Sequence, residues 1–269
     1  MNKTGSGILT VFYKYIRYKL RAGHKKGRGV HSSFVFELVS KVIYNYEKKI
    51  IPGSITGFYK SMLKCNEELQ IIDYGPGSRV TSSTVRKVSS IAKHSSISHK
   101  YGEILYRLSE WYRPGAVLEL GTGIGLSTIY LSAGSPGVRI ITVEGSPEKI
   151  QFAREQLTQL GVNNVEFVNE IFDDCLHDLL KKMKNHCLIF VDGDHRYEPT
   201  VKTVEQIIES EHLEEVIVVL DDIHWSDGME KAWKKLSEDE RISISLNLFF
   251  MGILIIRPGI KKQHFNISL

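Results

Sequence analysis

A short hydrophobic run that leads into a glycine loop constrains this chain more than any other segment. Residues 117–120 read Val-Leu-Glu-Leu, and glycine then occupies positions 121, 123 and 125 before a helical pattern begins. Glycines allow the backbone to turn sharply and to approach a ligand without a Cβ in the way. The dinucleotide fingerprint G-x-G-x-x-G requires glycine at position 126, where this chain has Leu126. The spacing therefore predicts a nucleotide-type site that fits NAD poorly.

Strand and helix patterns alternate regularly after residue 95. The β-branched runs lie at 116–120, 138–143, 165–168, 187–191 and 216–220. Strands separated by helices indicate βαβ units and a parallel sheet. At the end, 242–250 and 253–257 flank Met251-Gly252, which predicts an antiparallel hairpin with its turn at these two residues.

The first 95 residues show a less regular pattern. A basic helix and a glycine-containing loop precede a predicted helix from Ser33 to about Lys48, and residues 71–73 read as a strand that enters the turn Tyr74-Gly75-Pro76-Gly77. We therefore expect two domains, a mainly helical extension that acts as a lid over 1–95 and an α/β domain over 96–269.

Composition is that of a soluble globular chain. Hydrophobic residues make up 42% and charged residues 25% of the 269 positions. No apolar run approaches the roughly 18 to 20 residues that span a bilayer, and no signal-peptide pattern opens the chain. The three cysteines lack metal-type spacing and fit a reducing compartment. These features predict a cytoplasmic protein without a transmembrane segment.

The N-terminus concentrates positive charge, although the net charge of the whole chain is only +4. No acidic residue precedes Glu37, and the basic residues up to that point are Lys3, Lys14, Arg17, Lys19, Arg21, Lys25, Lys26 and Arg28. Apolar residues interleave with them at helical spacing. The pattern suits an anionic partner such as RNA, a membrane surface or an acidic substrate. The alternative is a solvated amphipathic helix that packs on the domain.

An acidic residue, Glu144, ends the strand that follows the glycine loop. A carboxylate at this place can accept hydrogen bonds from both hydroxyls of a ribose. The alternative is that it caps the next helix, which Pro147 begins and Gly161 ends. Because Ser146 stands in the cap position, we favour the ribose role for Glu144.

From about Ser96 to Arg257 the chain resembles the class I S-adenosylmethionine-dependent methyltransferases, most closely O-methyltransferases of the catechol and caffeoyl-coenzyme A type. The resemblance rests on the segment 119–125, on Glu144 and on Phe190-Val191-Asp192-Gly193-Asp194-His195, with Ser98-His99-Lys100-Tyr101-Gly102-Glu103 leading into the site. It implies a Rossmann-like methyltransferase fold, whose mostly parallel seven-stranded sheet has the order 3-2-1-4-5-7-6 and ends in the antiparallel hairpin. It also implies S-adenosylmethionine as the cofactor.

The same resemblance implies a set of cofactor-binding residues. They are Glu119, Gly121, Thr122, Gly123, Gly125, Ser127, Glu144, Gly145, Glu170, Ile171 and Asp192. The segment 169–172 would lie beside the adenine. For Glu119 the alternative is a cap of the loop, and for Glu170 a surface role stays open.

Three carboxylates are predicted to meet at the carboxyl edge of the sheet. Asp192 ends one strand, Asp221 and Asp222 end another, and in the expected order these strands are neighbours about 4.8 Å apart. Like charges so close must be protonated, hydrogen-bonded or bound to a cation, for which oxygen ligands favour Mg²⁺ or another hard divalent ion. The related enzymes have an Asn where Asp222 stands, while Trp225 matches. The added charge leaves open a stronger or a lost metal site, and the plainer alternative is that these aspartates cap helices and turns.

His195 is the predicted catalytic base, assisted by Asp192. It stands where the related enzymes carry a lysine, and an imidazole with a pKa of about 6.5 can accept a hydroxyl proton at neutral pH. The alternative is a turn histidine that binds backbone or water. His224 and Tyr197 are further candidates for lining the acceptor pocket.

The predicted function is therefore O-methylation of a small-molecule hydroxyl, with a divalent metal as a candidate assistant. An RNA methyltransferase, such as one acting on tRNA, is the alternative that the basic N-terminus favours. A non-catalytic cofactor-binding relative is the alternative from another class. Relatives often form dimers, which makes a homodimer an expectation, and the identity of the methyl acceptor cannot be read from the sequence.

Overall fold

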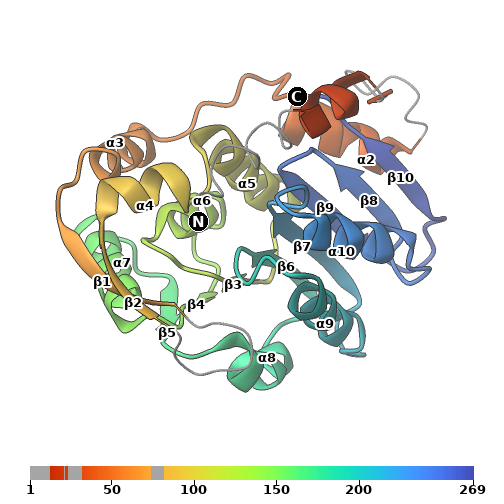
Figure 1. Ribbon diagram of the computed structural model, residues 1–269. Coiled ribbons are helices and arrows are strands. Elements are labelled where there is room, and N and C mark those ends of the chain that lie inside the picture. Colours follow the sequence, from red (N-terminus) through yellow and green to blue (C-terminus); the bar gives the residue numbers. More distant parts are fainter. Residues whose placement is uncertain (1–12, 21, 24–31, 74–81) are drawn as a thin grey trace. The chain divides into compact units, whose positions relative to one another are not determined.

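The computed structural model describes residues 13–20, 22–23, 32–73 and 82–269 (Figure 1). Two compact units make up the chain. The middle unit comprises Asn45–Ile189, and the terminal unit combines Met1–Tyr44 with Phe190–Leu269. Residues 45–95 thus belong to the same unit as the glycine loop. The division into domains at residue 95 stays a prediction.

The middle unit is an α/β body whose strands β3, β4 and β5 are parallel. Its elements are α3 (Gly53–Met62), β1 (Glu68–Asp73), β2 (Ser82–Lys87), α4 (Val88–His94), α5 (His99–Tyr112), β3 (Ala116–Leu120), α6 (Leu126–Gly134), β4 (Ile140–Val143), α7 (Pro147–Gln159), β5 (Val165–Val168), α8 (Phe172–Lys181) and β6 (His186–Val191), whose last two residues belong to the terminal unit. Every residue of β3 and β4 is buried, as expected for parallel strands covered on both faces. The expected strands at 116–120 and 165–168 are confirmed.

Helix α5 shows how the sequence sets the boundaries of an element. Its buried side chains include Tyr101, Ile104 and Leu108, which share one face at helical spacing. The helix stops because Arg113 adopts a left-handed conformation with a φ of 53° and Pro114 follows. Along its buried side α5 packs against α6 (Figure 1).

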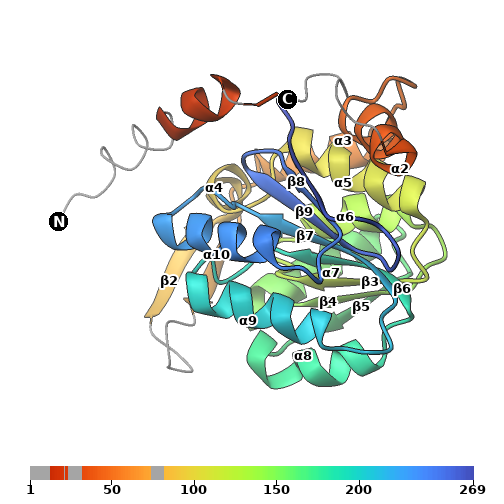
Figure 2. The same cartoon turned by 90° about the vertical axis from the view of Figure 1, so that its right-hand side faces the viewer.

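The terminal unit combines helices with a mostly antiparallel group of strands. Its elements are a helix at 13–20, α2 (Ser33–Glu37), the π-helical segment η2 (Leu38–Ile43), α9 (Tyr197–Ile208), β7 (Glu215–Asp221), α10 (Asp227–Glu238), β8 (Ile244–Asn247), β9 (Met251–Ile256) and β10 (Gln263–Asn266). Strand β9 is antiparallel to β7 and to β8. Helices α9 and α10 lie side by side (Figure 2). The helix expected over 33–48 ends at Ile43.

The strand order is β10-β8-β9-β7-β6-β3-β4-β5. Counted from β3 as the first strand, this contains the predicted order 3-2-1-4-5-7-6 and the C-terminal antiparallel pair. The prediction of seven strands was one short, because β10 adds an eighth, parallel to β8. A four-residue strand that follows Pro258, Gly259 and two lysines gives little periodic signal.

The turn of the hairpin lies at residues 248–250, so its predicted position at Met251-Gly252 was wrong. Gly252 is a strand residue whose Cβ would come within 2.4 Å of the Trp233 ring. Phe249 adopts the left-handed conformation, with a φ of 74°, and its backbone N–H donates to Asn247 Oδ1 at 2.9 Å. Gly252 therefore allows the Trp233 ring to pack closely against the strand, whereas Phe249 forms the turn.

Among the described residues, no helix is both long enough and apolar enough to cross a membrane. All three cysteines, Cys65, Cys175 and Cys187, are free thiols.

Candidate cofactor and active site

The glycine loop connects β3 to α6 and contains three glycines with positive φ. Gly121, Gly123 and Gly125 have φ values of 113°, 53° and 84°. A Cβ at Gly125 would press on Leu157 and Ala153 at 3.2 and 3.3 Å. At Gly123, by contrast, no atom lies within 4 Å of the Cβ position. The loop is therefore packed at its helical end and open at Gly123, where a ligand can approach the backbone.

Glu144 fixes the loop to the start of α7. Its Oε2 accepts the N–H of Gly123 at 3.0 Å, and its Oε1 accepts the N–H of Ser146 at 2.9 Å and lies 3.3 Å from Lys149 Nζ. The Ser146 hydroxyl makes no cap hydrogen bond. The ribose role of Glu144 was favoured because Ser146 would cap α7. That reason was wrong. The ribose role of Glu144 stays a prediction, because a carboxylate accepts up to about four hydrogen bonds.

Glu119 lies inside the middle unit and is fully buried. Its Oε2 accepts hydrogen bonds from the hydroxyls of Thr128 and Thr142, both at 2.6 Å. Thr122, in the loop, lies 2.6 Å from Thr142 through the two hydroxyl oxygens. These contacts join β3, β4 and α6. They favour a structural task for Glu119, while its cofactor role and that of the buried Ser127 stay predictions.

Asn169 ties the loop after β5 to the loop after β4. Its Nδ2 donates to the carbonyl oxygens of Glu144 at 2.7 Å and of Gly145 at 3.1 Å. Glu170 is exposed, and Ile171 is the N-cap residue of α8. Asn169 belongs to the segment 169–172 that was predicted to lie beside the adenine, but its hydrogen bonds to the backbone were not predicted. Glu170 and Ile171 stay predicted cofactor contacts.

A polar cluster on α5 and α6 was also missed. The Tyr130 hydroxyl lies 2.5 Å from His99 Nδ1, and His99 Nε2 lies 3.5 Å from Glu103, which also pairs with Arg107 at 3.4 Å. Burial raises the pKa of Tyr130 well above its usual value, with smaller contributions from Tyr59 and Glu103. The Tyr130 hydroxyl therefore stays protonated, and the direction of its hydrogen bond with His99 Nδ1 depends on the histidine tautomer.

The terminal unit brings the predicted catalytic residues together. His195 Nε2 lies 3.4 Å from Asp192 Oδ1, and both side chains are partly buried. Burial lowers the pKa of His195, but the hydrogen bond to Asp192 and the charges of nearby carboxylates outweigh it, so the pKa lies above its usual value. The pair has the form of a general base with a carboxylate partner.

Asp221 and Asp222 lie within electrostatic reach of Asp192. Burial, followed by the charges of Asp192 and Asp222, raises the pKa of Asp221 well above its usual value. Burial also raises the pKa of Asp222, with His195 acting against the shift and Asp192 adding to it. The three carboxylates therefore act on one another through their charges, while their predicted role as a metal site stays a prediction.

The cluster does not form a ready metal site. Among the residues that the structure describes, no group of three or more His, Cys, Asp and Glu side chains is arranged to hold a metal ion. A protonated carboxyl at the half-buried Asp221 would also be a poor ligand, since hard cations bind the ionised form. We therefore assign no step of the chemistry to a cation.

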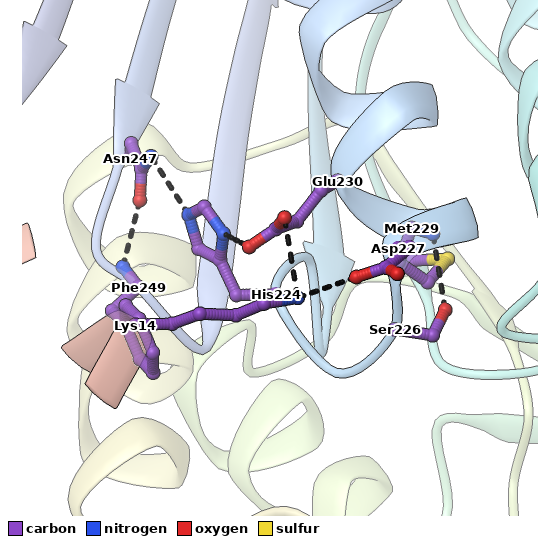
Figure 3. Close-up of polar contacts among 8 residues, drawn as sticks. All are labelled: Lys14, His224, Ser226, Asp227, Met229, Glu230, Asn247 and Phe249. Carbon is purple, nitrogen blue, oxygen red and sulfur yellow. Dashed lines mark hydrogen bonds and ion pairs between the residues drawn. The ribbon is translucent and has the colours of Figure 1, made fainter. Parts of the chain in front are cut away.

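His224 sits in a polar network with Glu230 and Asn247 (Figure 3). Its Nδ1 lies 2.9 Å from Glu230 Oε1, and its Nε2 lies 3.1 Å from Asn247 Nδ2. Because Asn247 Oδ1 accepts the N–H of Phe249, the amide nitrogen faces His224, whose Nε2 must accept and whose Nδ1 must donate. Both ring nitrogens are engaged, which favours a positioning role for His224.

Other predicted acceptor contacts are spread out. Tyr197 is the first residue of α9, and Trp225 is exposed. The predicted turn at 74–77 lies outside the described residues.

The strand order and the glycine loop define a methyltransferase-type α/β domain. The sequence model of a family described as "Methyltransferase domain" matches residues 118–223. The chain thus contains a methyltransferase domain of the class I type, as the sequence predicts.

Solved structures with the same fold cover most of the chain. A methyltransferase from Podospora anserina, solved with SAH bound, has a TM-score of 0.59 at 20% identity and covers 84% of this chain and 98% of its own. An O-methyltransferase from Bacillus cereus, in complex with SAH, has a TM-score of 0.57 at 18% identity, with 80% and 96% covered. At such identities the likeness shows the fold.

The curated relatives match a short part of the chain. The ribosomal RNA small subunit methyltransferase G of Pelodictyon phaeoclathratiforme is 39% identical over 69 residues, which are 25% of this chain and 30% of that protein. The protein of the same name from Stenotrophomonas maltophilia is 36% identical over 66 residues, or 23% and 31%. The chain therefore spans about a third of the length of these relatives.

Proposed function

We propose that this protein transfers a methyl group from S-adenosylmethionine to a hydroxyl of a small molecule. The observation that carries the proposal is the open backbone at Gly123 beside the fixed carboxylate of Glu144. The free space beside Gly123 can admit a nucleoside cofactor. The carboxylate of Glu144 can accept further hydrogen bonds there, from the hydroxyls of a ribose. Gly121, Thr122 and Gly145 would complete the cradle.

The terminal unit supplies the base for such a reaction. When bound, the cofactor supplies an electrophilic methyl group on a positively charged sulfur. We assign acceptance of the hydroxyl proton to His195 Nδ1, because Nε2 faces Asp192, which holds the ring and stabilises its protonated form. The acceptor oxygen forms a bond to the methyl carbon, the carbon–sulfur bond breaks, and S-adenosylhomocysteine leaves. The O-methyltransferase from Bacillus cereus supports this reaction class by likeness.

Calorimetric titration with S-adenosylmethionine tests the cofactor site. We expect Glu144→Ala to lower the affinity at least tenfold, because the ribose hydroxyls lose a charged acceptor. The matched control is Glu166→Ala on β5, whose exposed carboxylate pairs with Arg139, and we expect it to bind like the wild type. Absence of any binding heat in the folded wild-type protein would falsify the proposal.

The metal assistance that the sequence predicts is no step of the proposed reaction and is tested separately. The mutual repulsion of Asp192, Asp221 and Asp222 is the observation in its favour. A divalent ion would relieve this repulsion. Titration of Mg²⁺, Mn²⁺ or Ca²⁺ into the wild type and Asp192→Ala decides the question. Binding heat in the wild type that is absent in Asp192→Ala supports a cation site. The absence of binding heat in both proteins excludes it.

An RNA methyltransferase is the second candidate. The ribosomal RNA methyltransferases that match over 69 and 66 residues favour it, together with the basic N-terminus. Incubation with labelled S-adenosylmethionine and separated RNA and small-molecule fractions, with and without EDTA, distinguishes the acceptors. Cofactor binding without transfer to either fraction would instead indicate a non-catalytic relative.

A cytoplasmic location and a homodimer complete the proposal. Free thiols at all three cysteines support a reducing compartment. Light scattering during size-exclusion chromatography tests the dimer, which should have twice the monomer mass of 30.6 kDa.

A further inference from the structure

The helix at 13–20 has an inner face that is held on the terminal unit. Lys14 Nζ lies 2.8 Å from Asp227 Oδ1 and 3.2 Å from Glu230 Oε2, both on α10 (Figure 3). The Tyr18 hydroxyl lies 2.6 Å from the carbonyl oxygen of Asn247 and 2.5 Å from that of Ile267. These contacts fix which side of the helix faces the protein.

Aromatic packing reinforces the same face. The Tyr15 ring meets Phe249 edge-on, with centroids 5.0 Å apart, and stacks on Phe250 at 6.3 Å. Tyr18 lies 5.4 Å from Phe249 by ring centroids. The helix therefore presents its opposite side outward.

The outward side is apolar. Tyr13, Ile16 and Leu20 are 66%, 43% and 83% exposed. Their spacing of three and four residues places them along one stripe. With Arg17 they line a shallow hollow on the helix surface. Exposed apolar side chains gathered in this way mark an interaction surface rather than chance exposure.

Positive charge surrounds this stripe. Besides Lys14, which is held by α10, the charged residues of 13–20 are Arg17 and Lys19, both exposed, and no acidic residue lies among them. By sequence, the first acidic residue of the chain is Glu37. An apolar stripe bordered by cations complements a bilayer surface, where acyl chains receive the stripe and anionic headgroups receive the cations. Nucleic acid would use the cations but gain nothing from Ile16 and Leu20.

We propose that the outer face of helix 13–20, formed by Tyr13, Ile16, Arg17 and Leu20, binds the surface of membranes rich in anionic lipid. The helix lies in the plane of the headgroups and its inner face keeps its contacts with α10. The protein is then held peripherally at the membrane. This inference is independent of the reaction that the protein catalyses.

Vesicle flotation of the full chain tests the proposal. We expect the protein to float with phosphatidylcholine vesicles that contain about a third of phosphatidylserine, and to stay in solution with phosphatidylcholine alone. Leu20→Glu and Ile16→Glu should each lower the bound fraction at least tenfold at limiting lipid. Val85→Glu is the matched control, since it places the same charge on another exposed apolar residue, 64% exposed on β2. It should bind like the wild type.

Several results would overturn the proposal. These are no flotation of the wild type, equal flotation with neutral vesicles, or equal loss in Val85→Glu and Leu20→Glu. Thermal unfolding of the variants separates binding from folding, because an exposed Leu20 should leave the unfolding temperature unchanged. If Leu20→Glu proves unstable, Arg17→Glu with Lys19→Glu takes its place and should also abolish flotation. Structured RNA that binds the wild type and Leu20→Glu alike, without flotation, would identify a nucleic-acid surface instead.

Discussion

The carboxylates of the terminal unit favour the charged form of His195 but disfavour the charged forms of one another. Asp192 holds a proton on the imidazole by direct contact, whereas the same negative charge disfavours ionisation of the half-buried Asp221. Protonation of one residue in this cluster therefore depends on the state of the others. This coupling can be measured residue by residue.

The titration of His195 is the first measurable consequence. Its pKa is raised, so we expect the NMR signals of the ring to titrate above the usual value of about 6.5. Asp192→Asn removes the charge and should lower that pKa. If His195 is the base, kcat/KM rises with pH through the raised pKa, and the rise moves to lower pH in Asp192→Asn. Asp194→Asn is the control and should shift the titration less, because its charge is the weakest contributor. An unchanged pKa in Asp192→Asn would show that the pair does not form in solution.

The stability of the protein should also depend on Asp221. Its folded-state pKa is raised, so its ionisation penalises the folded state, and stability falls as the pH rises from about 3.8 to the folded pKa. The loss has a slope of at most about 1.4 kcal/mol per pH unit. We expect Asp221→Asn to remove this loss, with an advantage over the wild type that grows with pH in chemical denaturation. An advantage that is the same at pH 4 and pH 8 would contradict the assignment.

For single residues, the sequence could predict the residue type and its position in the fold, but not its hydrogen-bond partners. Glu144 was predicted at the end of β4 and is found there, next to the glycine loop. The sequence could not tell that its carboxylate accepts the N–H of Ser146, or that the Ser146 hydroxyl makes no cap hydrogen bond to α7. The geometry of the loop between β4 and α7 decides both.

At the scale of elements, the contact between α5 and α6 depends on a glycine. A Cβ at Gly102 would lie 2.3 Å from the ring of Tyr130, which is fully buried and has no room to move. We expect Gly102→Ala to destabilise the protein by about 1–3 kcal/mol through overpacking. Urea denaturation measures the change.

Gly57→Ala is the matched control. Gly57 lies within α3 and has no atom within 4 Å of its Cβ position. Alanine there should stabilise the protein by about 0.5–1 kcal/mol, because glycine costs more backbone entropy in a helix. The same change from glycine to alanine should thus destabilise the protein at position 102 and stabilise it at position 57. Equal effects at both positions would show that backbone entropy, and not the Tyr130 ring, sets the response at Gly102.

The elements of the sheet were predictable because parallel strands and their helices carry strong periodic signals. The hairpin turn was not, since Gly252 is explained by the Trp233 ring, a contact between residues far apart in the sequence. Phe249 in a left-handed conformation gives no local signal at all. Strand β10 was missed because four residues with one buried side chain, Phe265, barely show an alternation.

At the scale of the whole chain, its first and last parts meet in the terminal unit. Strand β10 covers the edge of β8, and the residues after it accept hydrogen bonds from two tyrosines near the N-terminus. Tyr18 binds the carbonyl of Ile267, and Tyr44 donates to that of Ser268 at 2.7 Å. The N-terminal helix and the C-terminal residues therefore support each other.

Removal of residues 263–269 should show this dependence. We expect a lower unfolding temperature and concentration-dependent aggregation, because the deletion leaves the edge of β8 without a partner strand. In the full chain, Tyr44→Phe should cost about 0.5–1.5 kcal/mol, the net value of one hydrogen bond. In the shortened chain the same substitution should cost less, since its acceptor at Ser268 is gone. Denaturation of the four proteins forms a double-mutant cycle whose coupling energy isolates this contact. A cost for Tyr44→Phe that is equal in both chains would mean that the hydroxyl finds its partner elsewhere and that the two ends fold independently.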